Sequence, residues 1–168
     1  MPELVQAARG CLILVVSCAP VIFQTHTTDI RARFEQETDA VRRAKLMHRL
    51  GEEQFHEIAK EISDGNLSQA LTILQQYRDE AEACIKALDA KVADPEKHSG
   101  GFKDLEISVR QSLRRLDELL VGMTSDDQKP FLEVREDLDR LNRHLVRELF
   151  PRQPNPDDSA SKQKSQPK

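Results

Sequence analysis

The sequence predicts an all-α protein: an antiparallel up-down bundle of about four helices, followed by a disordered C-terminal tail. Aromatic residues make up only 4% of the 168 residues and Trp is absent, a composition that disfavours a β-sandwich. Six Gly and eight Pro residues are too few for a collagen-like chain. Apolar residues also recur at steps of three and four along most of the chain, as they do on one face of a helix.

The charge of the chain is high but mixed in sign. It has 25 Lys and Arg residues against 29 Asp and Glu residues, which gives a net charge of −4. Domains that bind nucleic acid usually have a strong positive excess. We therefore expect no nucleic-acid partner, and the 38% of hydrophobic residues suits a single core.

The N-terminus resembles a bacterial export signal. The apolar run from Cys11 to Phe23 is interrupted by Ser17 and Pro20, so it is shorter than the roughly 20 apolar residues that a membrane-spanning helix needs. The sequence therefore predicts a signal peptide or lipoprotein leader over residues 1–23 and export to the periplasm or the cell envelope of a bacterium.

A short motif inside this leader resembles the bacterial lipobox. It reads Val15-Val16-Ser17-Cys18, and in a lipobox the cysteine receives a diacylglyceryl group. This interpretation makes Cys18 the lipidation site and ties the domain to a membrane. Two alternatives stay open: a leader removed by ordinary signal peptidase, and an unprocessed N-terminus on a cytoplasmic helical adaptor.

The helical domain is predicted over residues 24–150. Its first part follows a seven-residue apolar repeat, typical of a coiled coil, that also passes through His48. The apolar members of this repeat are Phe34, Val41, Phe55 and Ile62. The pair Thr38-Asp39 predicts a break and a new helix cap. Gly65 predicts the end of this region, and Asn66 with Gln69 predicts a capping box for the next helix.

Three further helices are expected. The second stops by Asp94-Pro95, the third follows Gly101, and the fourth has Pro130 in its first turn. The apolar stripe of the second helix is Leu67, Leu74, Ala81 and Leu88. That of the third is Phe102, Leu105, Val109, Leu113, Leu116, Leu120 and Met123, and that of the fourth is Phe131, Val134, Leu138, Leu141, Leu145 and Leu149. Residues 151–168 have almost no apolar side chain, which predicts a disordered tail.

One alternative architecture is a helical repeat. The stretch from Gly65 to Leu71 resembles the turn of a tetratricopeptide repeat. The expected helices are longer than that repeat allows, and no second copy is present in the sequence. The pattern favours the plain bundle.

Three residues form the best candidate for a metal site. His48, Glu52 and His56 are spaced four residues apart, which places them near one another on a helix, and Zn²⁺ binds such side chains. Glu53 and His56 match the Glu-x-x-His element of ferritin-like bundles, but only once. We therefore predict no metal and no cofactor, with a metal- or ligand-binding bundle as the alternative function.

Cysteine and nucleophile patterns do not favour an enzyme. Cys11 and Cys18 lie in the leader, and Cys84 lies on a helix face, where we expect a small buried side chain. The sequence contains no Gly-rich phosphate loop and no Gly-x-Ser-x-Gly element. We predict no catalytic residue and no small-molecule substrate.

Basic residues form two rows that could contact phosphate groups, for example those of anionic lipids. The rows are Arg42, Arg43, Lys45 and Arg49, and Arg140, Arg143 and Arg147. In the second row we expect the ion pairs Glu136–Arg140 and Asp139–Arg143, because each pair is four residues apart on a helix. Such pairs usually neutralise a solvated face.

Several sequence blocks resemble an uncharacterised family of exported bacterial helical proteins, and the likeness spans most of the chain from Asp29 to Pro154. The blocks are Phe34–Asp39, Val41–Leu46, Gly100–Lys103 and Leu149–Pro154. The resemblance implies export and a helical fold, and it implies no activity. We therefore expect a non-enzymatic envelope protein, an interaction module for an unknown protein partner or for self-association.

Overall fold

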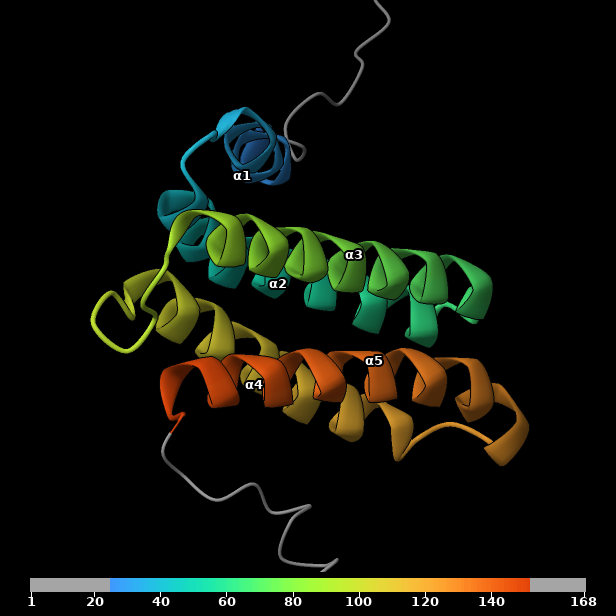
Figure 1. Cartoon of the computed structure of the whole chain (residues 1–168). Helices are drawn as coiled ribbons and strands as arrows, with labels where there is room; N and C mark the ends of the chain where they lie inside the picture. Colours follow the sequence, from blue (N-terminus) through green and yellow to red (C-terminus); the bar gives the residue numbers. More distant parts are fainter. Residues whose placement is uncertain (1–24, 152–168) are drawn as a thin grey trace, which may run out of the picture.

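The structure is a computed structural model that describes residues 25–151. This part contains five helices and no strand, so the predicted all-helical class is confirmed (Figure 1). The helices are α1 (Thr25–Gln36), α2 (Ala40–Ser63), α3 (Leu67–Lys91), α4 (Gly100–Leu120) and α5 (Ser125–Leu149). The proposed leader, 1–23, with Cys18, lies outside the described residues, as does the tail beyond Pro151.

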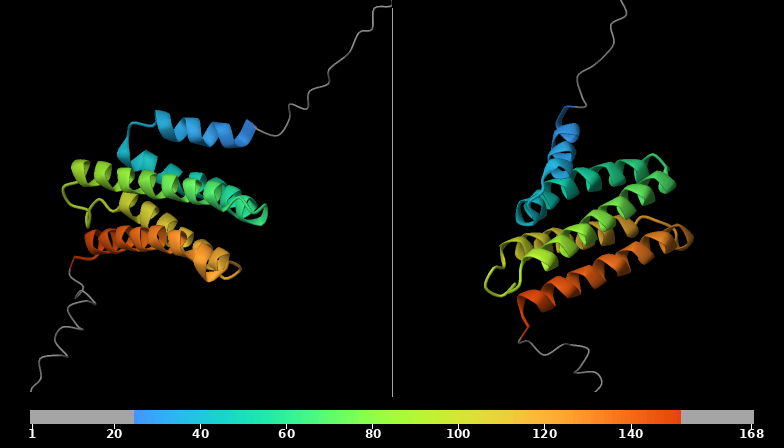
Figure 2. Two further views of the ribbon diagram at one scale, coloured as in Figure 1. Left: turned by 90° about the vertical axis from the view of Figure 1, so that its right-hand side faces the viewer. Right: turned by 45° about the horizontal axis from the view of Figure 1, so that its top comes forward.

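The helices are arranged as two connected pairs with one helix added. A short turn joins α2 to α3, another joins α4 to α5, and the members of each pair pack along one another (Figure 1). Helix α2 also packs on α4, and α3 packs on α5. Helix α1 packs on α2 and lies at the opposite side of the molecule from α5 (Figure 2).

The break between α1 and α2 occurs where Thr38-Asp39 predicted it. Asp39 is the N-cap of α2, and its carboxylate accepts the backbone N–H of Arg42 at 2.9 Å. Glu37 in turn accepts the backbone N–H of Asp39 at 2.9 Å. These two bonds satisfy amides that a continuous helix would have paired, so the chain changes direction and a fifth helix is formed.

The buried face of α2 differs from the predicted repeat. Val41 and Ile62 are only half-buried and His48 is exposed, whereas Ala44 and Gly51 are fully buried. The buried residues of α2 are Ala40, Ala44, Met47, Leu50, Gly51, Gln54, Phe55 and Ile58. Gly51 lies against α3, where a Cβ at its position would be 2.9 Å from a carbon of the Tyr77 ring.

The apolar stripes of the later helices are largely confirmed. Every predicted stripe residue of α4 is buried, and Met123 just beyond the helix is half-buried. On α5 the side chains of Leu141 and Leu149 are half-buried. The buried residues of α3 are Ala70, Ile73, Leu74, Tyr77, Ala81, Cys84, Ile85 and Leu88. Those of α5 are Phe131, Val134, Leu138 and Leu145. Together with α2 and the α1 residues Ile30 and Phe34 they form one core.

Asn66 is the N-cap of α3, as predicted, but the predicted capping bond is missing, and the predicted start of α5 is wrong. Gly65 has the expected left-handed backbone, with φ of 81°, but the Asn66 side chain donates to Glu61 and does not cap α3. Helix α5 begins at Ser125, so Pro130 lies inside it. Its early start is stabilised by the N-cap Thr124, whose hydroxyl accepts the Asp127 N–H at 3.4 Å.

Candidate functional site

The three predicted metal-binding residues lie on the outer face of α2 but do not form a cluster. His48 Nε2 lies 3.8 Å from Glu52 Oε1, and the side chains of both residues are about half exposed. His56 is also exposed. Among the described side chains of residues 29–151, no three His, Cys, Asp or Glu residues are arranged to hold a metal ion. The seven-residue repeat that passes through His48 therefore does not follow the buried face of α2, because His48 is exposed.

Glu52 and His56 instead line a surface groove between α2 and α4. The groove has a volume of about 390 Å³, and Arg115 Nη2 reaches across it to within 3.5 Å of Glu52 Oε1. Its lining residues are Glu52, Phe55, His56, Ala59, Arg115, Glu118 and Leu119. Apolar side chains and charged side chains of both signs meet there. Such a groove suits a side chain of a protein partner better than a single ion.

A second groove lies where α1 meets α2, and three of its six lining residues are basic. It has a volume of about 420 Å³ and is lined by Arg33, Gln36, Glu37, Arg42, Lys45 and Leu46. The Arg42 guanidinium lies 3.0 Å from the Glu37 carboxylate. Hydrogen bonds to the Glu37 carboxylate, chiefly from the Asp39 backbone N–H and also from the Arg42 side chain, hold the pKa of Glu37 below its usual range. Glu37, the one carboxylate that lines the groove, is therefore ionised and paired with Arg42.

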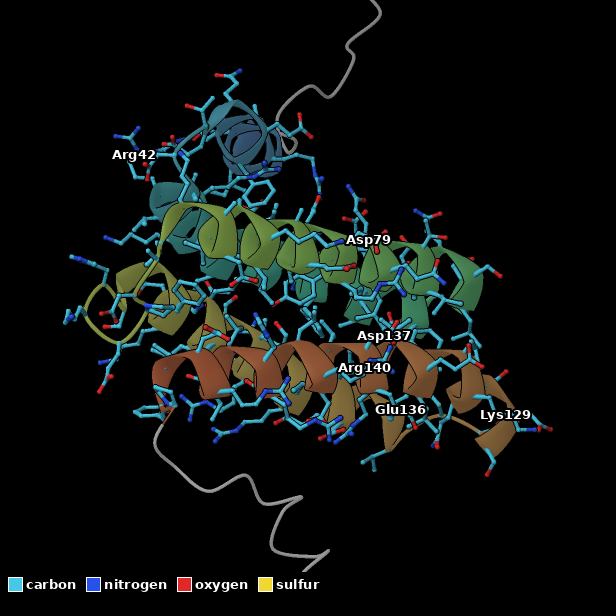
Figure 3. The ribbon with its side chains drawn as sticks, in the orientation of Figure 1. Arg42, Asp79, Lys129, Glu136, Asp137 and Arg140 are labelled. Atoms are coloured by element: carbon cyan, nitrogen blue, oxygen red, sulfur yellow. The ribbon has the colours of Figure 1, made fainter. Side chains whose placement is uncertain are left out.

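A third groove, between α3 and α5, is lined by paired charges. It has a volume of about 200 Å³ and is lined by Arg78, Glu82, Asp137, Arg140 and Leu141. Asp137 accepts Arg78 Nη1 at 2.8 Å and is also paired with Arg140 (Figure 3). The predicted Glu136–Arg140 pair is therefore replaced by a pair three residues apart, because Asp137 is the carboxylate that faces α3. The predicted Asp139–Arg143 pair is present, at 3.1 Å.

The structure divides the first basic row into different roles. The Arg43 guanidinium carbon lies 4.5 Å from the centre of the Phe34 ring, so this half-buried side chain ties α2 to α1. Arg42 and Lys45 face the α1–α2 groove, and Arg49 is exposed beyond them. Sequence reasoning missed the contribution of Arg33, because Arg33 belongs to another helix and faces the same groove as Lys45 only through the packing of α1 on α2.

Cys84 is buried, as expected from its place on the apolar face of α3. Only 1% of the surface of Cys84 is exposed, and burial raises the pKa of its thiol to about 11. A nucleophilic cysteine needs the opposite, an accessible thiol with a lowered pKa. Cys84 therefore acts as a core side chain.

Comparisons of the chain with protein-family models, with curated proteins and with solved structures give no match. None of the five helices in residues 25–151 combines the length and the apolar character of a membrane span.

Proposed function

We propose that the protein is a non-enzymatic interaction module, exported to the bacterial cell envelope and anchored there by a lipid on Cys18. The lipobox-like motif carries the proposal, and the position of the first helix supports it. Helix α1 begins at Thr25, so only six residues separate it from Cys18. An acyl chain on Cys18 would therefore hold the helical domain close to the membrane surface.

The grooves between helices support an interaction role. The α2–α4 groove combines the apolar side chains of Phe55 and Leu119 with the exposed charges of Glu52 and Arg115. Protein interfaces commonly surround an apolar centre with a polar rim. The partner is a second protein or another copy of this chain, and the proposal needs no nucleic acid, cofactor or small-molecule substrate.

We also propose that α2 to α5 form an antiparallel up-down bundle to which α1 is added. The short turns after α2 and α4 favour neighbouring helices of opposite direction. The packing of α2 on α3 and α4, and of α5 on the same two helices, supports this order around a shared core. Helix α1 is joined to this group by Arg31, whose guanidinium lies 2.8 Å from Glu80 on α3.

The lipid anchor is tested by intact-mass measurement and fractionation of the Cys18→Ser variant. The native protein should be found with membranes and should have the mass of a chain that starts at Cys18 and carries acyl groups. The Cys18→Ser variant should be exported but released from the membrane, because it lacks the thiol that accepts the lipid. Cys11→Ser is the matched control and should behave like the native protein.

Retention of Cys18→Ser at the membrane would contradict the anchor. A full-length mass in the cytoplasmic fraction would contradict export and would instead favour the cytoplasmic adaptor. A protein that is cleaved at another position and released into the periplasm would support export but contradict the lipid on Cys18.

A further inference from the structure

Two cations in the groove between α1 and α2 have no counter-charge in the described part of the chain. Arg33 on α1 and Lys45 on α2 are both exposed and both line the groove. Neither makes an ion pair or a side-chain hydrogen bond with the described side chains, which are those of residues 29–151. The single lining carboxylate, Glu37, is already bound to Arg42 at 3.0 Å. The groove therefore has a local positive excess, although the whole chain has a net charge of −4.

Two arginines in the basic row of α5, Arg140 and Arg143, show what neutralised cations look like on the same molecule. Arg140 is paired with Asp137, and Arg143 lies 3.1 Å from Asp139. An additional anion has little to gain at Arg140 and Arg143, because both guanidinium groups already have a carboxylate partner. The α1–α2 groove differs in that cations from two helices face one space of about 420 Å³ and two of them are unpaired in this part of the chain.

We propose that the α1–α2 groove binds the phosphate of an anionic phospholipid headgroup. The Arg33 guanidinium can donate two hydrogen bonds to phosphate oxygens, and the Lys45 ammonium adds a second positive charge. Two further cations lie on neighbouring elements: Arg49 is exposed four residues after Lys45 on α2, and Lys91 Nζ of α3 lies 3.5 Å from the Thr38 carbonyl oxygen. Cations spread over a surface in this way suit an array of headgroups better than one small anion.

The place of the groove in the chain supports a lipid source for the phosphate, and here the inference rests on the proposed envelope location. The groove lies at the C-terminal end of α1, a helix of 12 residues that follows the leader directly. At a rise of about 1.5 Å per residue, the groove is within about 18 Å of Thr25. A domain tethered at Cys18 would therefore hold these cations within reach of headgroups.

The inference is tested with the purified full-length Cys18→Ser protein, so that no acyl chain contributes to binding. Its affinity is measured by cosedimentation with vesicles of phosphatidylcholine alone and with vesicles that also contain phosphatidylglycerol. We expect tighter binding to the anionic vesicles and a loss of about tenfold or more in that affinity for Arg33→Gln/Lys45→Gln. The leader is identical in all variants, so its own affinity for lipid cancels in the comparison.

The matched control is Lys103→Gln/Arg114→Gln, which removes the same charge from two exposed cations on α4. It should keep the affinity of the parent protein, and circular dichroism should show unchanged helicity for both double variants. Equal losses in the two double variants would overturn the groove as the site, because they would indicate attraction by overall charge. Equal binding to both kinds of vesicle would also overturn the proposal.

A competition experiment distinguishes lipid from soluble phosphate. Pyrophosphate is added to the anionic vesicles at constant ionic strength, and we expect it to leave the bound fraction unchanged. Displacement by pyrophosphate that depends on Arg33 and Lys45 would overturn the lipid assignment in favour of a soluble phosphate anion. These measurements do not require acylation of Cys18. Headgroup binding by the groove can therefore be confirmed or overturned independently of the lipid anchor.

Discussion

At the scale of single residues, the centre of the core is organised around one polar ring. Tyr77 is fully buried, and its hydroxyl accepts a hydrogen bond from Ser112 at 2.7 Å. Ser108 lies 3.4 Å from the same hydroxyl, and the Phe55 ring packs edge-on with its centre 5.4 Å away. The serines satisfy a group that would otherwise be costly to bury, so α3 and α4 are fixed in register.

The burial of Tyr77 predicts a loss of stability in alkali. Burial raises the pKa of Tyr77 above its ordinary value of 10, because the charged phenolate is poorly solvated in the core. The unfolded chain ionises at the ordinary pKa, so stability is complete below pH 10 and decreases as the pH rises above it. The chain has one Tyr and no Trp, so tyrosinate absorbance reports this residue alone.

Tyrosinate absorbance and the loss of helical circular dichroism should therefore rise together in an alkaline titration. Ionisation near pH 10 with unchanged helicity would show that the ring is accessible in the folded protein.

Cys84 should be unreactive in the folded protein. In a Cys11→Ser/Cys18→Ser variant it is the one remaining thiol. Its pKa, raised from 9.0 to about 11, alone lowers the thiolate fraction by about a hundredfold at neutral pH, and burial blocks access further. A chromogenic disulfide reagent should label the native protein far more slowly than the protein in denaturant. Rapid native labelling would contradict the buried position.

At the scale of helices, glycine at two positions permits close packing. A Cβ on Gly51 would lie 2.9 Å from a carbon of the Tyr77 ring, and a Cβ on Gly101 would lie 2.7 Å from a methyl carbon of Leu88. Leu88 is fully buried and, like Tyr77, cannot move into solvent. The close contacts of α2 and α4 with α3 thus depend on the absence of a side chain at these positions.

Gly51→Ala should destabilise the protein by about 1–3 kcal/mol, because the added methyl group overpacks the core against Tyr77. Gly100→Ala is the matched control: nothing lies within 4 Å of its Cβ, and alanine favours the helix. Chemical denaturation of both variants measures the difference. A Gly51→Ala variant as stable as Gly100→Ala would mean that Tyr77 shifts freely.

Two leucines of the apolar stripe of α5 that look equivalent in the sequence differ in burial. Leu138 is fully buried, whereas Leu141 is half-buried beside the α3–α5 groove. Leu138→Ala should lower the free energy of unfolding by about 2–5 kcal/mol, because it leaves a cavity. Leu141→Ala should cost clearly less, since solvent can fill part of the space. Equal losses in urea denaturation would contradict this difference in burial.

At the scale of the whole molecule, α1 is held to the other helices by few but varied contacts. Ile30 and Phe34 are buried, Arg43 stacks on the Phe34 ring, and Arg31 bridges to Glu80. Glu80 also accepts a hydrogen bond from the buried side chain of Gln54 at 3.0 Å. The α1–α2 groove exists only while these contacts are made, so the proposed lipid site depends on the docking of α1.

Removal of the C-terminal tail should leave the stability of the helical domain unchanged. Apart from one alanine and two prolines, the residues after Pro154 are all polar or charged, so we expect them to add little to a core. A chain truncated after Pro154 should unfold at the same temperature as the full chain in calorimetry. A clear decrease in that temperature would show that the tail binds the helices.

The apolar pattern predicted the helical class and most of the core, and the polar turn residues, Thr38-Asp39 among them, predicted where helices end. Helical periodicity and turn residues act locally, so Phe102, Leu116 and Phe131 are buried as predicted and Gly65 ends α2. Where local signals conflicted, the prediction was wrong: the seven-residue repeat placed His48 near the core, although the buried face of α2 lies over Gly51.

The grooves were decided by the tertiary structure. A charged residue on the flank of a helix has several partners of similar energy within its own helix, so local spacing favoured Glu136 for Arg140. Packing brought Asp137 between Arg78 and Arg140 instead, and in the same way set Arg115 beside Glu52. The sequence determined which faces are apolar, but only the contact between helices decided which charges meet, because those contacts depend on helix orientation rather than on spacing.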